Sequence, residues 1–217
     1  MSGGRPGPKP RLVAASAALA AVLFIALFRF RRLGPLDFWA WLAMNIALVV
    51  ALSFAVDKGY GRRLKKDIGT GFLRKAGIGI VSAIALYAVF AAGRAAALRL
   101  FPFAAAGIGN VYSLRSGVPL LLIVLLIVLL IGPGEEIFWR GFFQENTGAE
   151  PGRTAGFILA SLLYTSVHLA SGNVMLILAA ALCGLFWGWL YLRFRSPLLN
   201  IVSHTVWDLL VFVLFPF

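Results

Sequence analysis

Residues 118–143 read VPLLLIVLLIVLLIGPGEEIFWRGFF, and this stretch decides the fold. Its first half is an unbroken apolar run, and no charged residue occurs between Ser116 and Gly134. Because an α-helix rises about 1.5 Å per residue, a run of this length crosses a hydrocarbon core of about 30 Å. Backbone polar groups in lipid need internal partners, and the run lacks the alternation of a strand. The stretch therefore predicts a membrane-spanning helix that carries charged residues in its second half.

The same apolar pattern recurs along the chain, which is 61% hydrophobic and only 13% charged. Soluble domains are closer to half apolar, so most of this chain is expected in lipid or buried among its own helices. We predict an all-α fold, a polytopic transmembrane bundle of about seven or eight helices with an intramembrane polar site. The expected spans are residues 12–30, 38–56, 76–98, 118–144, 154–169, 174–192 and 197–216.

Three parts follow from this pattern. Residues 1–11 form a basic tail, rich in proline and glycine, that we expect to be disordered. Residues 12–117 hold the N-terminal transmembrane helices and connecting loops, and 99–117 is expected to lie along the membrane interface. Residues 118–217 form a core that contains the unusual polar residues. The only cysteine, Cys183, excludes an internal disulfide and lies in an apolar run, where a small buried residue is expected.

The net charge of +12 does not indicate a nucleic-acid partner, because the basic residues lie between hydrophobic spans. There they hold loops in the cytoplasm and meet anionic lipid headgroups. The most basic segment, Asp57–Lys75, is therefore expected in the cytoplasm, with the N-terminus inside and the C-terminus outside. Arg29, Arg31 and Arg32 then fall outside; either they snorkel to the interface or the first two helices form a shallower hairpin.

Ionisable groups at membrane depth are costly and need a reason to be there. Once loops and helix ends are set aside, few such groups remain, and they come from three different predicted spans. This distribution predicts one polar site inside the bundle. The candidate residues are Glu135, Glu136, Arg140, His168, His204 and Asp208.

The acidic pair of the first span predicts two different roles. Glu136 and Arg140 are four residues apart, so they share a helix face and can pair. Glu135 is rotated by about 100° and is left free to act as a general base. The alternative is that both acids mark a helix end and that the ion pair only sets registry. Gly132-Pro133-Gly134 just before them predicts a kinked or loosened helix.

The two histidines leave two chemistries open. Tyr164 lies one helical turn before His168, and Asp208 one turn after His204, so Asp208 can orient the His204 ring. His168, His204 and Glu135 could hold one divalent metal ion, most plausibly Zn²⁺, with a position open for water. Alternatively, Glu135 and a histidine activate water directly while His204 and Asp208 stabilise an oxyanion. Neither a His-Glu-x-x-His helix nor a Gly-x-Ser-x-Gly elbow is present.

Three motifs in order, GEEIFWRGFF, LLYTSVHLASG and CGLFWGWLYLRFRSPLLNIVSHTVWDLL, resemble the CPBP (ABI) intramembrane proteases. This family includes the CAAX prenyl endopeptidases of the Ras-converting type, and the resemblance covers residues 118–210. It implies cleavage of a peptide bond in a membrane-anchored protein or peptide, by a metal or by a glutamate without metal. On the matching positions it implies that Glu135 activates water with His168, and that Glu136, Arg140, His204 and Asp208 complete the site.

Departures from the family pattern limit what the resemblance implies. Tyr164 replaces the commoner phenylalanine, and Asp208 stands where the prenyl-processing branch has asparagine. An eighth helix seen in some relatives is expected to be absent or displaced. The bacterial-type relatives therefore suggest the plasma membrane of a prokaryote, and helix depths suggest a site toward the cytoplasm. The alternatives are a non-catalytic membrane partner, such as a bacteriocin-immunity factor, and a proton-coupled transporter, which the lack of internal repeats disfavours.

Overall fold

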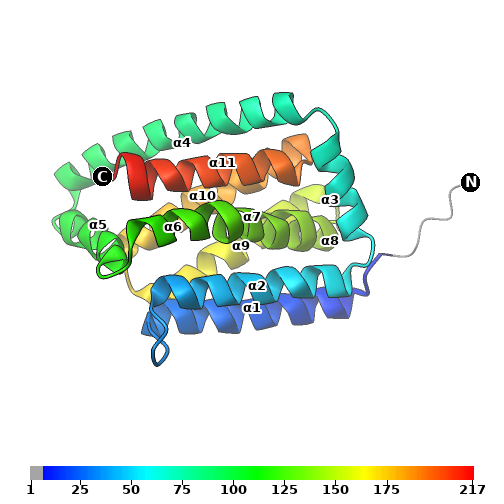
Figure 1. Ribbon diagram of the computed structural model, residues 1–217, viewed down its shortest axis with the longest axis horizontal. Helices are drawn as coiled ribbons and strands as arrows, with labels where there is room; N and C mark the ends of the chain where they lie inside the picture. The colour runs from blue at the N-terminus through cyan, green and yellow to red at the C-terminus, as the bar shows by residue number, and fades with distance from the viewer. Residues whose placement is uncertain (1–6) are drawn as a thin grey trace, which may run out of the picture.

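Seven helices long and apolar enough to span a membrane run side by side in the computed structural model, which describes residues 7–217 (Figure 1). They confirm the seven predicted hydrophobic segments and the all-α membrane bundle. The spans are α1 (Pro10–Phe30), α2 (Phe38–Val56), α4 (Phe72–Leu100), the continuous run Leu120–Thr147, α9 with its terminal turn (Arg153–Ser171), α10 (Val174–Phe194) and α11 with its terminal turn (Pro197–Leu214).

Two predicted loops contain short helices, and the first helix begins inside the range predicted as a tail. The basic segment forms α3 (Tyr60–Gly69), and the 99–117 segment forms α5 (Ala104–Tyr112) and a 3₁₀ turn (Ser113–Arg115). Of the expected disordered tail at 1–11, residues 1–6 lie outside the described part. Helix α1 already begins at Pro10, a residue suited to a first helical turn because it has no N–H to leave unpaired.

Polar side chains cap the helices whose starts matter most for the polar site. Asn173 Oδ1 accepts from the backbone N–H of Met175 at 3.0 Å, at the start of α10. Ser196 Oγ accepts from Leu199 N at 3.2 Å, ahead of Pro197 in the first turn of α11. Both caps satisfy backbone donors that a helix start leaves open, so they fix where α10 and α11 begin.

The fourth span is widened on both sides of Gly132-Pro133-Gly134, which is one of the two disturbances, kinking or loosening, that this triplet predicts. α6 (Leu120–Leu126) leads into a π-helical turn at Ile127–Ile131, and α7 (Gly132–Glu136) leads into a longer π-helical segment at Ile137–Gln144, followed by α8 (Glu145–Thr147). In the wider turns, backbone N–H groups bond to carbonyls five residues back instead of four. The Tyr60 hydroxyl also donates to the Ile137 carbonyl at 3.0 Å. π-Helical turns are rare and occur frequently at functional sites.

Glycines let α10 approach α9 closely. A Cβ on Gly188 would lie 2.8 Å from Phe157 Cδ2 and from Ser161 Oγ, and one on Gly184 would lie 3.2 Å from Tyr164 Cδ1. The Ser161 hydroxyl donates to the Gly184 carbonyl at 3.0 Å. This confirms the close packing that two glycines four residues apart allow in a membrane helix. It also fixes the face of α9 that carries Tyr164 and His168.

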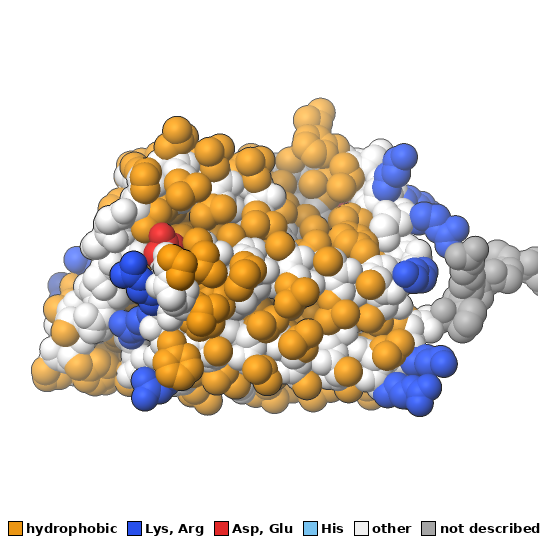
Figure 2. Space-filling model, turned by 60° about the horizontal axis from the view of Figure 1, so that its bottom comes forward, with side chains coloured by type: hydrophobic (Ala, Val, Ile, Leu, Met, Phe, Trp, Pro, Cys, Tyr) orange, Lys and Arg blue, Asp and Glu red, His pale blue; other side chains and the backbone are white. Residues whose placement is uncertain are grey.

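A broad apolar band separates two ends where Lys and Arg side chains gather (Figure 2). One end holds α3, the start of α1 and the α10–α11 turn, and the other holds the α1–α2 turn and α5 (Figure 1). At the α3 end, Asp57 accepts from Arg63 Nη2 at 2.6 Å and from Asn146 Nδ2 at 3.4 Å. Burial raises the pKa of Asp57, but the hydrogen bonds and charge of Arg63, together with Asn146 and the Gly59 N–H, leave that pKa below its ordinary value.

Candidate active site

The six polar residues singled out from the sequence meet in the middle of the bundle. Glu135, His168, His204 and Asp208, together with Tyr164, line one cavity of about 130 Å³. The rest of its wall is mainly aromatic and aliphatic, including Phe28, Trp39, Cys183, Trp187 and Trp207. Glu136 and Arg140 lie behind this wall and are buried. Three spans that are distant in sequence thus contribute to one polar site in an apolar interior.

Glu136 is the centre of the buried hydrogen-bond network. Its Oε1 accepts from Arg140 Nη1 at 3.1 Å and from His204 Nδ1 at 2.8 Å. Its Oε2 accepts from Asn200 Nδ2 at 3.0 Å. The side chains of Glu136 and Arg140 are 0% and 2% exposed, so the charges compensate each other without water. Such a network links the fourth span to α11 and holds its members in fixed orientations.

Aromatic rings enclose the network and fix its members further. Trp187 stacks on His204 with centroids 3.6 Å apart and an interplanar angle of 21°. The Arg140 guanidinium lies 4.8 Å from the Tyr164 ring centroid and 5.7 Å from that of Trp187. Cation–π contacts of this kind gain strength when the cation is desolvated. Arg140 therefore holds α9 and α10 against the acidic pair, in addition to neutralising Glu136.

Glu135 differs from Glu136 in its access to the cavity and in its hydrogen bonding. It lines the cavity, whereas Glu136 does not. Its Oε2 atom is buried and has no hydrogen-bond partner within residues 7–217. A buried polar atom in a native structure that lacks a partner calls for an explanation, and an oxygen facing a cavity can accept from a water or a ligand held there.

The tautomer of His168 follows from its backbone contact. Nδ1 lies 2.7 Å from the Tyr164 carbonyl oxygen, which can only accept, so Nδ1 carries the proton. Nε2 then keeps a lone pair and can act as a base. The rings of Phe28 and Tyr164 hold the imidazole, with centroids 4.2 Å and 5.0 Å from it.

His204 lies between two carboxylates. Nδ1 contacts Glu136 at 2.8 Å, and Nε2 lies 3.6 Å from Asp208 Oδ2, one turn along α11. With an acid on each side, the ring can carry a proton on both nitrogens. A protonated Nε2 that lines a cavity is a donor suited to a developing negative charge.

The expected metal set is not assembled in this arrangement. Glu135, His168 and His204 line the same cavity, yet no group of three His, Cys, Asp or Glu side chains within residues 7–217 is placed to hold a metal ion. Each histidine is held through Nδ1, by the Tyr164 carbonyl or by Glu136, and Nε2 makes no hydrogen bond within the described residues. A metal ion at this site stays a prediction.

Sequence reasoning missed two residues of the site. Asn200 binds Glu136 and also donates to the Trp187 carbonyl at 2.8 Å, and Trp187 covers His204. A signal for Asn200 was present, because Asn200, His204 and Asp208 form a four-residue series along one face of an apolar helix. Trp187 offered no comparable signal, since an aromatic residue in an apolar helix is ordinarily packing.

The cavity extends toward one end of the bundle only. Beyond the polar residues it is lined by Phe28, Phe38, Trp39 and Leu114, which lie toward the α1–α2 turn. The basic helix α3 lies at the opposite end (Figure 1). The basic helix and the aromatic end of the cavity therefore lie toward opposite ends of the bundle.

Comparison with known proteins agrees with the motif pattern. Residues 117–210 match the family model Rce1-like, described as type II CAAX prenyl endopeptidase Rce1-like. No curated protein and no solved structure matches the chain. The matched range contains all six polar residues, the three spans that bear them, and Asn200 and Trp187. Residues 117–210 of this membrane protein therefore match an Rce1-like domain, which supports the CPBP/CAAX protease family that the three motifs predicted.

Proposed function

We propose that this protein is an intramembrane endopeptidase that hydrolyses a peptide bond of a membrane-associated protein or peptide by water activated at Glu135 and His168. One observation carries the proposal: an unpartnered carboxylate oxygen of Glu135 and an imidazole whose Nε2 is free line the same cavity. Both are proton acceptors, and their shared cavity is polar only where these residues and their partners line it. Family membership supports peptide hydrolysis as the reaction.

In the proposed mechanism, a water molecule held by Glu135 and His168 attacks the carbonyl carbon of the scissile peptide bond. The carboxylate takes the water proton as the carbon–oxygen bond forms, as a general base does. His204 donates from Nε2 to the oxyanion of the tetrahedral intermediate, while Glu136 holds the ring at Nδ1 and the nearby Asp208 carboxylate stabilises the positive charge of the ring. The captured proton then passes to the leaving amine, so that the products are a carboxylic acid and an amine.

Glu136, Arg140 and Asn200 are positioning residues in this mechanism. Glu136 binds His204, Arg140 and Asn200 bind Glu136, and none of the three lines the cavity. Their buried network keeps the Nδ1 side of His204 committed, so that Nε2 is the nitrogen available to substrate. Second-shell hydrogen bonds orient catalytic groups in this way in many enzymes.

Orientation follows the basic residues rather than the depth estimate. We infer that the protein lies in the plasma membrane of a prokaryote with α3 in the cytoplasm, since Lys and Arg are retained on that side. The cavity then opens toward the opposite side of the membrane. This proposal departs from the expectation of a site toward the cytoplasm, which rested on helix depths alone.

The test is cleavage of a membrane-anchored reporter peptide by the purified protein in lipid nanodiscs. Glu135→Gln and His168→Ala are expected to reduce the rate by at least about 100-fold, the scale of a lost general base. Glu150→Gln, which changes an exposed acid, is the matched control. Unchanged rates in Glu135→Gln or His168→Ala would refute the assignment. Elemental analysis and chelation of the same preparation decide whether a metal ion takes part.

A further inference from the structure

Tyr164 brings the one hydroxyl group found in the wall of the polar cavity. It lies on α9, one turn before His168, and its side chain is buried. The hydroxyl is close enough to the Glu135 carboxylate to interact with it. No step of the proposed mechanism uses this group.

The hydroxyl of Tyr164 is free, in contrast to those of the other tyrosines. Each of the other four donates to an oxygen atom of the protein; these are Tyr60, Tyr87, Tyr112 and Tyr191. The Tyr164 hydroxyl makes no hydrogen bond of comparable geometry within residues 7–217. It is therefore a donor without a fixed acceptor beside the proposed reacting groups.

The ring of Tyr164 is held in place, so that only the O–H can turn. The Arg140 guanidinium lies 4.8 Å from the ring centroid, and the Trp139 ring meets it edge-on with the centroids 5.4 Å apart. On α10, a Cβ at Gly184 would lie 3.2 Å from Tyr164 Cδ1, so the ring occupies the space that this glycine leaves. Because a hydroxyl hydrogen rotates, a fixed phenol can still move its hydrogen from one acceptor to another.

Two of the indole N–H donors in the cavity wall already have partners. Trp187 Nε1 donates to Ser203 Oγ at 3.2 Å, and Trp39 Nε1 donates to the Leu114 carbonyl at 3.0 Å. The thiol of Cys183, which also lines the cavity, is only a weak donor. None of these groups can replace a free hydroxyl.

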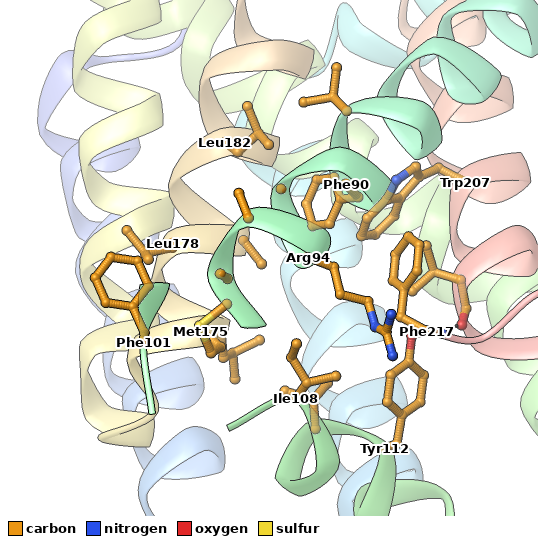
Figure 3. A pocket seen from close by; sticks show the side chains of 18 of the residues that line it. Phe90, Arg94, Phe101, Ile108, Tyr112, Met175, Leu178, Leu182, Trp207 and Phe217 are labelled. Carbon is orange, nitrogen blue, oxygen red and sulfur yellow. Dashed lines mark hydrogen bonds between the residues drawn. The ribbon is translucent and has the colours of Figure 1, made fainter. Parts of the chain in front are cut away.

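The third indole, that of Trp207, stands between the cavity and an apolar groove of about 320 Å³ (Figure 3). Its ring meets the Phe90 ring at a centroid distance of 4.7 Å, and Figure 3 shows its indole nitrogen on the side that faces Phe90. The residues that line both spaces are apolar or aromatic: Val111, Leu176, Ala179, Trp207 and Phe212. In such surroundings each donor that reaches a developing negative charge stabilises it more than in water.

Both departures from the family pattern line this cavity. Asp208 stands where the prenyl-processing branch has asparagine, and Tyr164 stands where phenylalanine is commoner. An asparagine amide can donate through its NH₂ group, whereas an ionised aspartate only accepts. One departure therefore removes a donor from the cavity, and the other adds one.

We propose that the Tyr164 hydroxyl is a further catalytic residue, which donates to the oxyanion of the tetrahedral intermediate beside His204 Nε2 and so supplies the donor that Asp208 lacks. This inference rests on the proposed function, because an oxyanion forms only if a peptide bond is hydrolysed. The phenol keeps its proton throughout. Its O–H turns from Glu135 to the oxyanion as water attacks, and it turns back when the carbonyl group forms again.

The first test is the kinetics of Tyr164→Phe on the membrane-anchored reporter peptide in nanodiscs. The substitution removes the hydroxyl and keeps the ring contacts with Arg140 and Trp139. We expect kcat to fall about 100-fold or more, the cost of one lost oxyanion donor, while KM stays within about twofold. Tyr87→Phe is the control, because its hydroxyl donates to the Phe215 carbonyl at 2.9 Å and does not line the cavity.

The second test asks whether positions 164 and 208 exchange a donor. Asp208→Asn places an NH₂ group in the cavity, which matters most when the tyrosine hydroxyl is absent. We expect Asp208→Asn to be about tenfold or more better for kcat in the Tyr164→Phe background than in the wild-type background. Loss of packing alone would not produce this coupling.

The third test uses a peptidyl phosphonate, whose tetrahedral, negatively charged phosphorus group resembles the intermediate. Tyr164→Phe is expected to weaken its binding about tenfold or more. Binding of the matching amide peptide, measured in a Glu135→Gln background so that it is not consumed, is expected to stay unchanged.

Three results would overturn this inference and leave the proposed function intact. They are a wild-type kcat in Tyr164→Phe where Glu135→Gln is inactive, strictly additive effects of Tyr164→Phe and Asp208→Asn, and equal weakening of the phosphonate and the amide peptide. A wild-type protein that does not cleave the reporter, or a Glu135→Gln variant that cleaves it at the full rate, refutes the proposed function and this inference with it.

Discussion

The adjacent glutamates Glu135 and Glu136 are expected to differ in how much the substitution of each by glutamine changes the stability of the protein. Glu136→Gln removes the charge that compensates Arg140, whose side chain is 2% exposed, and it disrupts contacts with His204 and Asn200. Removing one partner of a buried ion pair costs about 3–5 kcal/mol, because the other charge stays buried and uncompensated. Glu135→Gln removes a carboxylate that has an unpartnered oxygen, so the free energy of unfolding is expected to change by less than about 1 kcal/mol.

Thermal unfolding of the purified protein, followed by tryptophan fluorescence, separates the two variants. At about 2–4 °C per kcal/mol for a chain of this size, Glu136→Gln lowers Tm by roughly 6–20 °C. Glu135→Gln leaves Tm within about 4 °C of the wild-type value and removes the activity. The double variant Glu136→Gln/Arg140→Met takes both charges out and recovers part of the loss, since a buried pair can be replaced by apolar groups at little cost. Equal Tm shifts in the two single variants would refute the division of roles between the glutamates.

Three further predictions concern packing, pH and orientation. Gly188→Ala puts a Cβ 2.8 Å from a ring carbon of the facing helix α9 and is expected to lower the free energy of unfolding by about 1–3 kcal/mol. Gly77→Ala, whose Cβ meets no atom within 4 Å, is the control and is expected to leave it unchanged; denaturant titration measures both. Because the pKa of Asp57 is lowered in the folded protein, its ionised carboxylate contributes to the free energy of unfolding, by under about 1 kcal/mol beside a half-exposed arginine. This contribution is full above about pH 4 and is lost as the pH falls through the folded-state pKa of Asp57. Tm measured against pH is expected to show the loss, and Asp57→Asn to abolish it. In a cysteine-free background, Ser116→Cys is labelled by an impermeant thiol reagent in intact cells and Thr70→Cys only after permeabilisation; the reverse pattern would place the cavity on the cytoplasmic side.

The spans could be predicted because lipid imposes a strong, local constraint on composition. A run of about 20 apolar residues has few alternatives in a chain of this hydrophobicity, so all seven spans were predicted from the sequence. The short helices α3 and α5 were missed because they lie at the bundle ends, where polar and apolar residues mix and composition no longer decides. Around Pro133 the sequence predicted a kinked or loosened helix without deciding between them, because a proline disturbs the backbone but does not specify how; the structure has π-helical turns on both sides.

Within the site, contacts inside one helix were predictable and contacts between helices were not. The spacing of four residues gave the Glu136–Arg140 and His204–Asp208 pairs, which the structure forms at 3.1 Å and 3.6 Å. The contact between Glu136 and His204 joins residues 68 positions apart and depends on how the fourth span is rotated against α11. Nothing in the local pattern specifies that rotation. Resemblance to the family indicated that the residues belong together, but not that Glu136 holds His204 while Glu135 faces the cavity.

The π-helical turns on either side of Gly132–Glu136 have a consequence for which length changes this span tolerates. Each wide turn accommodates more chain per revolution than an α-helix does, so the residues before and after it are out of phase with a regular helix. Deleting one residue from Ile137–Gln144 would allow ordinary α-helical hydrogen bonding and a straighter rod. It would also turn everything beyond the deletion by about 100° and carry Gln144 away from the Gly188 carbonyl of α10, to which it donates at 2.9 Å. The span is thus more regular when it is one residue shorter, but only the longer register brings Gln144 to α10.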